Sequence, residues 1–430
     1  MRTTTVALIF LLAGLAGHAD AQINVGSDGS DGAFAFVADA GDPNVMTIDL
    51  GLATTATWTT PSPVAGLGVY DPTEWVVVFK FTNVTVPAGK LVRFSNHPTR
   101  APVVWLSQGD VVIDGEVDLD GADGHHNADT PTWAEPGPGG FRGGRGKLSG
   151  SAELGTAGFG PGGAFAHSEH AHGSAAGHAR DGLLEHWASL PGLAYGASEI
   201  PRLIGGSGGG GNRNPSMNEI SGSGAGGGAM LIAAETTVRV TGALHANGGG
   251  DGGWSGGQTK IGGDGSGGSI RLVGDVVVVT SAALLRCLGS YYASPGRIRI
   301  EANTHVLETP TVPLAHLGRP SAVIPGATEP TVRIVSIDGL PVPSDPTAAL
   351  DNLYADVLTT GNGVKNVVIR GMHAPDLTPV ELRLTDSRGD AVLYTGTLSA
   401  AGQPANQTEA TIAVTFPASI VTLQARALLP

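Results

Sequence analysis

The stretch "GGGAMLIAAETTVRVTGALHANGGG", residues 226–250, places two alternating apolar runs between two runs of glycine. The first run extends from Met230 to Ala234 and the second from Val238 to Ala246. Alternation with a period of two predicts β-strands that turn one face toward a core. Glycine loses the most backbone entropy on ordering, so glycine runs beside strands need a separate explanation.

The same two-part unit recurs at residues 103–121 ("VVWLSQGDVVIDGEVDLDG"), 269–287 ("SIRLVGDVVVVTSAALLRC") and, in a shorter form, 296–306 ("GRIRIEANTHV"). In this alignment Val104 takes the place of Met230, and the two alternations lie seven or eight residues apart. A repeated strand–turn–strand unit is typical of stacked coils, because each coil buries its apolar face only against its neighbours. The sequence therefore predicts an all-β fold with a β-solenoid, similar to a parallel β-helix. An antiparallel sandwich with similar strands is the alternative.

A long glycine-rich excursion, about residues 122–223, interrupts these units. Glycine makes up 67 of the 430 residues, more than twice its usual share of about 7%. Such a run is either a loop or a region where backbones approach too closely for side chains, as in polyproline II and collagen packing. No strict Gly-x-y period exists. Interspersed apolar residues such as Phe141, Phe159 and Tyr195 favour a partly ordered flap that folds back onto the solenoid, with a fully disordered segment as the alternative.

The beginning of the chain resembles an export signal. Arg2 precedes an apolar run over residues 6–16, and residues 19–21 offer a small-x-small cleavage pattern. The run is shorter than the roughly 20 residues that span a bilayer. We therefore expect a signal peptide over residues 1–21 and a secreted or cell-surface protein without a membrane span.

The composition changes from about residue 325. Glycine becomes rarer, and alternating runs such as "TVRIVSIDG" and "TIAVTFPASIVTLQARAL" recur between Pro, Gly, Asp and Asn. This rhythm over about 100 residues predicts an immunoglobulin-like (Ig-like) β-sandwich. The expected organisation is a solenoid domain over residues 22–324, which includes the excursion, and a sandwich over residues 325–430.

Charge and cysteine content restrict the function classes. The net charge of −14 argues against a nucleic-acid partner, whose phosphates require Lys and Arg. A single cysteine, Cys287, excludes an internal disulfide, and its place in an alternating run predicts a buried apolar role.

Several short sequence segments, taken in order along the chain, are similar to segments of other proteins. They include "GSDGSDGAFAF", "PVVWLSQGDVVIDGEVDLDG", "GPGGFRGG", "IGGSGGGG", "GSGGSIRLV" and "GRIRIEA". The chain resembles a group of secreted glycine-rich bacterial proteins from planctomycete-like and related bacteria, over about residues 24–303. The resemblance implies a β-solenoid core and an extracellular location. It implies no catalytic residue.

Two groups of residues are candidate metal ligands. Asp118, Asp120 and Asp123 alternate in "DLDGADG", and clustered carboxylates suit calcium, which prefers hard oxygen ligands. "HSEHAH" brings His167, Glu169, His170 and His172 into six residues, and imidazole with carboxylate suits a transition metal. The other interpretations are an acidic strand end for the first group and a solvated polar segment for the second.

The function expected from these features is that of a secreted or cell-surface structural or adhesive protein of the extracellular matrix, without evident catalysis. One alternative is a protein that binds or degrades polysaccharide, as a lyase or glycoside hydrolase would, on a face of the solenoid. A second alternative is a metal-holding protein that uses the His-rich insertion. The expected partners are extracellular polysaccharide or other cell-surface proteins.

Overall fold

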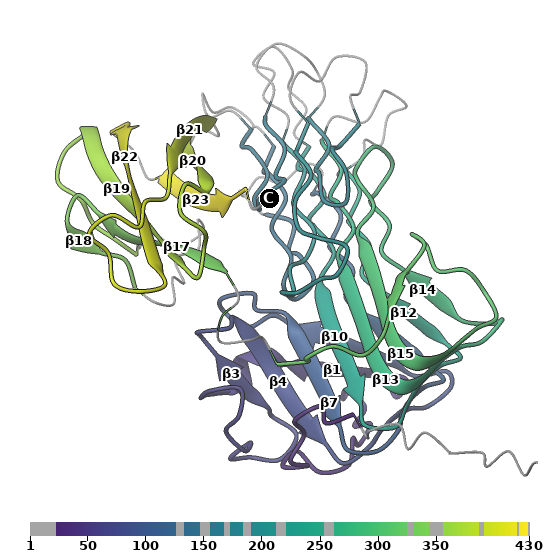
Figure 1. Cartoon of the computed structure of the whole chain (residues 1–430). Helices are drawn as coiled ribbons and strands as arrows, with labels where there is room; N and C mark the ends of the chain where they lie inside the picture. The colour runs from purple at the N-terminus through teal and green to yellow at the C-terminus, as the bar shows by residue number, and fades with distance from the viewer. Residues whose placement is uncertain are drawn as a thin grey trace, which may run out of the picture.

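The computed structural model describes residues 23–125, 133–146, 155–166, 173–183, 191–211, 221–252, 262–324, 328, 330–343, 356–386, 391–418 and 421–428 (Figure 1). The fold is all-β, as predicted: strands account for 39% of the residues and helix for 1%, and the largest sheet is a curled half-barrel. Among the described residues we find no helix with the length and apolar character needed to cross a membrane.

The largest sheet has eleven strands. They are β2 (Thr54–Thr55), β3 (Val69–Asp71), β4 (Val76–Phe81), β5 (Val84–Val86), β7 (Val103–Ser107), β8 (Val111–Ile113), β10 (Ala229–Ala234), β11 (Thr237–Val240), β13 (Ser269–Val279), β15 (Arg297–Leu307) and β16 (His316–Gly318). The long strand β13 pairs with β10 through its first half and with β11 through its second half. The strands β13 and β15 thus join two ladders that are otherwise formed by separate short strands.

A second sheet has five strands in the order β1 (Val45–Asp49), β6 (Leu91–Ser95), β9 (Glu116–Asp118), β12 (Ala243–His245) and β14 (Leu284–Arg286). All four of its pairings are parallel. Each pass of the chain from β7 to β9, from β10 to β12 and from β13 to β14 thus contributes to both sheets.

The registers confirm most of the predicted repeat. In the second part of the unit, Val238 pairs with Val111 and Val277, as the alignment requires. In the first part, Met230 pairs with Val103 rather than with Val104. The alignment was wrong by one residue there because β7 is buried on both faces, so apolar character does not tell its two faces apart.

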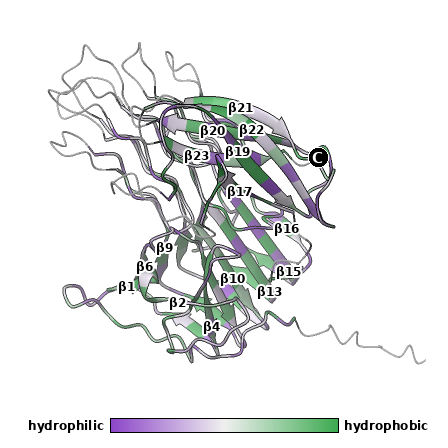
Figure 2. Cartoon of the chain, turned by 90° about the vertical axis from the view of Figure 1, so that its left-hand side faces the viewer, coloured by the Kyte–Doolittle hydropathy of each residue, from purple (hydrophilic) through white to green (hydrophobic). Residues whose placement is uncertain are grey.

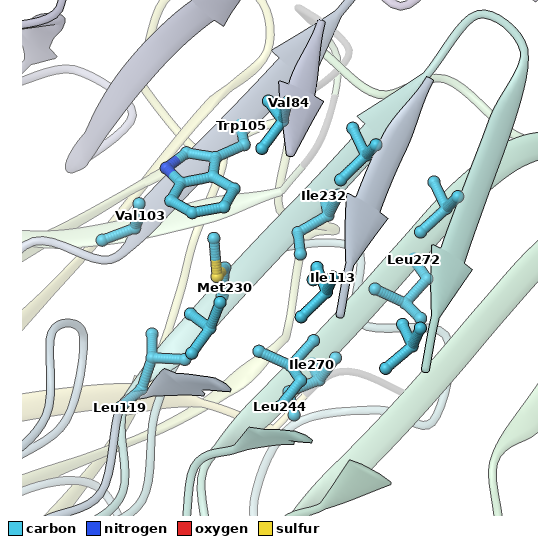
Figure 3. Packing of buried hydrophobic residues seen from close by; sticks show 14 of the residues in the cluster. Val84, Val103, Trp105, Ile113, Leu119, Met230, Ile232, Leu244, Ile270 and Leu272 are labelled. Carbon is cyan, nitrogen blue, oxygen red and sulfur yellow. The ribbon is translucent and has the colours of Figure 1, made fainter. Parts of the chain in front are cut away.

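Two hydrophobic clusters lie on the two faces of the large sheet. The cluster enclosed by the two sheets contains Val103, Trp105, Met230, Ile232 and Ile270 together with Cys287, whose predicted apolar role is confirmed. Figure 3 shows side chains of this cluster from successive strands packed together. The other face carries a smaller cluster, and the hydropathy of β10 and β13 accordingly shows long apolar stretches (Figure 2).

The glycine-rich segments continue the strands beyond the sheets, and their hydrogen bonds follow a period of three. Successive N–H groups of residues 222–228 donate in turn to three neighbouring segments, over residues 119–125, 141–144 and 263–266. For example, the N–H groups of Gly222 and Ala225 both donate to the first of these segments. Three residues per turn is the repeat of a polyproline II helix. We refer to these packed segments as the glycine bundle.

The interior of the glycine bundle excludes side chains. Residues 205–211, 221–228 and 262–268 are all buried and consist of Gly, Ser and Ala apart from Asp264. A Cβ atom added to Gly226 would lie 1.8 Å from the carbonyl oxygen of Gly206. The expected surface flap is therefore wrong for the described residues. No Gly-x-y period occurs because an interior segment is surrounded on all sides and needs a small residue at all three positions.

The strands after residue 330 form two antiparallel sheets that share one hydrophobic core. One sheet has the order β18 (Leu340–Pro341), β17 (Thr331–Ile337), β19 (Gly363–Met372) and β22 (Gln407–Phe416), and the other has β21 (Ala391–Thr397), β20 (Pro379–Asp386) and β23 (Val421–Ala427). Arg383 of β20 connects these sheets to the glycine bundle. Its Nη1 donates to the carbonyl oxygen of Gly163 at 2.6 Å, and its guanidinium lies 4.4 Å from the ring centre of Phe165.

Replacement of Gly226 by alanine should lower the free energy of unfolding by roughly 1–3 kcal/mol or more, because the added methyl group overpacks the bundle. Gly41 is the matched control, since a Cβ atom there meets nothing within 4 Å, and its replacement should change stability by less than about 0.5 kcal/mol. Denaturant unfolding of the two variants measures both values. Equal stabilities would contradict the close packing described for the bundle.

Candidate functional site

A cluster of acidic side chains surrounds one histidine on the outer face of the five-stranded sheet. Asp118, at the end of β9, pairs in register with His245 at the end of β12, and Glu116 begins β9. The intervening residues Val117 and Leu244 point inward and are buried in the core. Alternation along each strand therefore places the acidic residues and the histidine together on the outside.

The imidazole of His245 contacts carboxylates through both ring nitrogens. Its Nε2 lies 2.9 Å from Oε1 of Glu116. Its Nδ1 lies 3.2 Å from Oδ1 of Asp120 and 3.6 Å from Oδ1 of Asp118. The side chain of His245 is only 17% exposed, so these contacts form at a partly buried position.

The surrounding charges change the acid–base properties of the cluster. Burial alone would lower the pKa of His245, but the carboxylates of Asp118 and Asp120 raise it to about 10. Burial alone would raise the pKa of Asp118, but its contact with His245 and the backbone N–H of Asp120 lower it instead. The cluster therefore stabilises a cation at the position of the imidazole.

Backbone and amide groups hold the carboxylates in place. The N–H of Asp120 donates to Oδ1 of Asp118 at 2.8 Å. Asp120 in turn accepts hydrogen bonds from the backbone N–H and the side-chain amide of Asn247. The Oδ1 of Asn247 accepts a hydrogen bond from the N–H of Leu288 at 2.8 Å, which connects this support to the segment after β14.

The structure brings some of the predicted metal ligands together but not all of them. Asp118, Asp120 and His245 offer ligand atoms that all lie within 4.8 Å of one another, so these three residues could hold a metal ion. Asp123 does not belong to this group, and its Oδ1 accepts a hydrogen bond from the N–H of Gly250 at 2.6 Å. The four residues of the second predicted site, His167, Glu169, His170 and His172, lie outside the described residues.

Sequence reasoning missed His245, although a signal for it was present. In the repeat alignment, Leu244 corresponds to Val117. The residues that follow them, His245 and Asp118, therefore occupy equivalent outward positions. Asp118 and His245 therefore had to be neighbours on adjacent strands. The prediction considered each acidic run by itself and did not compare equivalent outward positions between units.

A second polar group packs against the segments of the glycine bundle. The Nδ1 of His178 lies 2.6 Å from the carbonyl oxygen of Gly267, and its ring stacks on Tyr195 with the ring centres 4.5 Å apart. The Tyr195 hydroxyl donates to the carbonyl oxygen of Gly205. Burial lowers the pKa of His178 to about 4. This pair joins separate bundle segments and keeps the imidazole neutral.

Comparison of the chain with protein-family models, with curated proteins and with solved structures found no match.

The buried His178 should make stability depend on pH. Its pKa is about 4 in the folded protein and about 6.5 in an unfolded chain. Between these values the unfolded chain binds a proton that the folded protein does not. The unfolding free energy should therefore fall by roughly 1.4 kcal/mol for each pH unit as the pH decreases from about 6.5 to about 4.

Denaturant unfolding across this pH range, for the wild type and His178→Gln, measures the effect. Glutamine retains a donor for the Gly267 carbonyl but does not titrate, so the variant should show a shallower loss of stability. The same slope in both proteins would show that His178 does not determine the acid sensitivity.

Proposed function

We propose that the protein is a secreted or cell-surface structural or adhesive element. In this proposal the parallel strands from β4 to β16 are the coils of a β-solenoid, and the two C-terminal sheets form an Ig-like sandwich. Support for the solenoid comes from the column of paired residues Val103, Met230, Ile270 and Ile298 in four successive strands. Such columns are expected when equivalent positions of stacked coils lie above one another.

The observation that carries the proposal is the three-neighbour hydrogen bonding of the glycine bundle. An interior segment such as residues 222–228 is fixed to three other segments at every turn, so it cannot bend without breaking bonds in several directions. The bundle is also continuous with the sheets, since residues 222–228 lead directly into β10. Stiffness over this length suits a protein that holds a position at a surface.

The two ends of the glycine bundle differ. One end merges with the strands, as at Leu119, whose carbonyl oxygen accepts from Gly228. At the other end, Gly222 donates to the carbonyl oxygen of His125 and accepts from the N–H of Gly252. This arrangement, in which one end of the bundle is joined to the sheets, is consistent with an adhesive protein.

Polysaccharide binding is the second candidate, and one feature of the five-stranded sheet favours it. Thr47, Asp118, His245 and Arg286 lie on its outer face beside Arg93, which donates to Thr47 at 3.0 Å. Adjacent strands are about 4.8 Å apart, so polar groups recur at regular intervals across the sheet. A row of polar and charged groups across several strands suits an extended polar chain more than it suits a small molecule.

A panel of extracellular polysaccharides, incubated with the protein that begins at residue 22, tests the proposal. We expect retention of one or more polysaccharides without any change in their chain length. Replacement of both Arg93 and Arg286 by alanine should weaken retention, because the polar row loses its two guanidinium groups. Arg239→Ala, on an exposed position of β11 in the other sheet, is the matched control.

Release of shortened polysaccharide would contradict the structural or adhesive proposal and would favour a lyase or hydrolase. If the replacement of both Arg93 and Arg286 by alanine leaves retention unchanged, the five-stranded sheet is excluded as the binding surface.

A further inference from the structure

We propose that Asp118, Asp120 and His245 form a zinc site, with Glu116 as the group that orients the imidazole. This inference goes beyond the proposed function and does not depend on it. The ligands come from two paired strands and from the segment that continues the first of them into the glycine bundle. They were brought together by the register of the coils rather than by a local sequence motif.

The separations between the ligand atoms match zinc coordination. Zinc binds imidazole nitrogen and carboxylate oxygen at about 2.0–2.2 Å, so two ligands of a tetrahedral site lie roughly 3.3 Å apart. The Nδ1 of His245 lies 3.2 Å from Asp120 and 3.6 Å from Asp118. All three ligand atoms lie within 4.8 Å of one another, so they can converge on one ion.

The state of the His245 ring gives an independent argument. Its Nδ1 atom is buried and lies 3.2 Å from a carboxylate oxygen of Asp120 and 3.6 Å from one of Asp118. Its Nε2 is held by Glu116 at 2.9 Å. Histidines that bind metals commonly donate their second ring N–H to a carboxylate, which fixes the tautomer and directs the other nitrogen at the ion. His245 has this arrangement, with Nδ1 directed at the two aspartates.

The ligand chemistry favours zinc over calcium. Calcium takes six to eight oxygen ligands and does not select imidazole, whereas this group offers one nitrogen and two carboxylates. Two aspartates also neutralise one divalent ion. Asp120 is exposed, so water can occupy a fourth position. Binding replaces the proton on Nδ1 of His245, which leaves the imidazole as a neutral ligand.

Titration of the purified chain with Zn²⁺ against a chromophoric chelator tests the site. Because His167, His170 and His172 could bind zinc separately, the measurement uses a protein with all three replaced by alanine as the reference. In that reference we expect one zinc ion per chain. His245→Ala and Asp118→Asn should each weaken binding by about 100-fold or more, and Glu116→Gln by about 10–100-fold.

His305→Ala is the matched control, since His305 lies on β15 away from the cluster, and it should bind zinc like the reference. Co²⁺ in place of zinc should give visible absorption bands of a low-coordinate nitrogen–oxygen site, and these bands should disappear in His245→Ala. Circular dichroism of Asp118→Asn, which keeps the side-chain shape, separates lost binding from lost folding.

Unchanged zinc affinity in both His245→Ala and Asp118→Asn would overturn the proposal, as would binding of Ca²⁺ in preference to Zn²⁺. Failure to bind any metal at micromolar concentration would show that the cluster is an ion pair only. None of these results depends on polysaccharide retention, so the zinc site and the proposed function fail separately.

Discussion

The structure depends on the close approach of one backbone to another. In the glycine bundle, N–H and carbonyl groups of neighbouring segments bond directly, and no side chain can lie between them. Each glycine loses entropy on ordering, and the hydrogen bonds to three neighbours offset that loss collectively. The bundle then continues into β10 and β13, so the same segments that pack without side chains lead directly into neighbouring strands of the large sheet.

Alignment of the strands explains the polar cluster as well as the core. Once Leu244 lies beside Val117 in the interior, His245 must lie beside Asp118 on the outside. The core selects the register, because a shift by one residue would turn the apolar positions outward. The carboxylates and the imidazole are therefore held together by the buried residues next to them in the chain, Val117 and Leu244.

The sequence correctly predicted those strands in which apolar and polar residues alternate. Strands around Val238 and Leu244 were found with their partners, since one face of each is apolar and the other polar. The strand at Val103 was shifted by one because both of its faces are buried. The glycine bundle was not foreseen because its three-residue period lies in the hydrogen bonds, not in the residue types. His245 escaped notice because its partners are far away in the chain, as Glu116 is at 129 positions.

The three-residue period of the bundle also limits how its sequence can evolve. Deletion of one residue from a segment such as 222–228 would rotate every later N–H by a third of a turn. Each donor would then face a different neighbour, and all the contacts of the segment would change together. Deletion of three residues would restore the rotation and shorten the segment by one turn. Segment lengths in this part of the protein should therefore drift among relatives in steps of three, while substitutions among Gly, Ala and Ser accumulate freely only at its periphery.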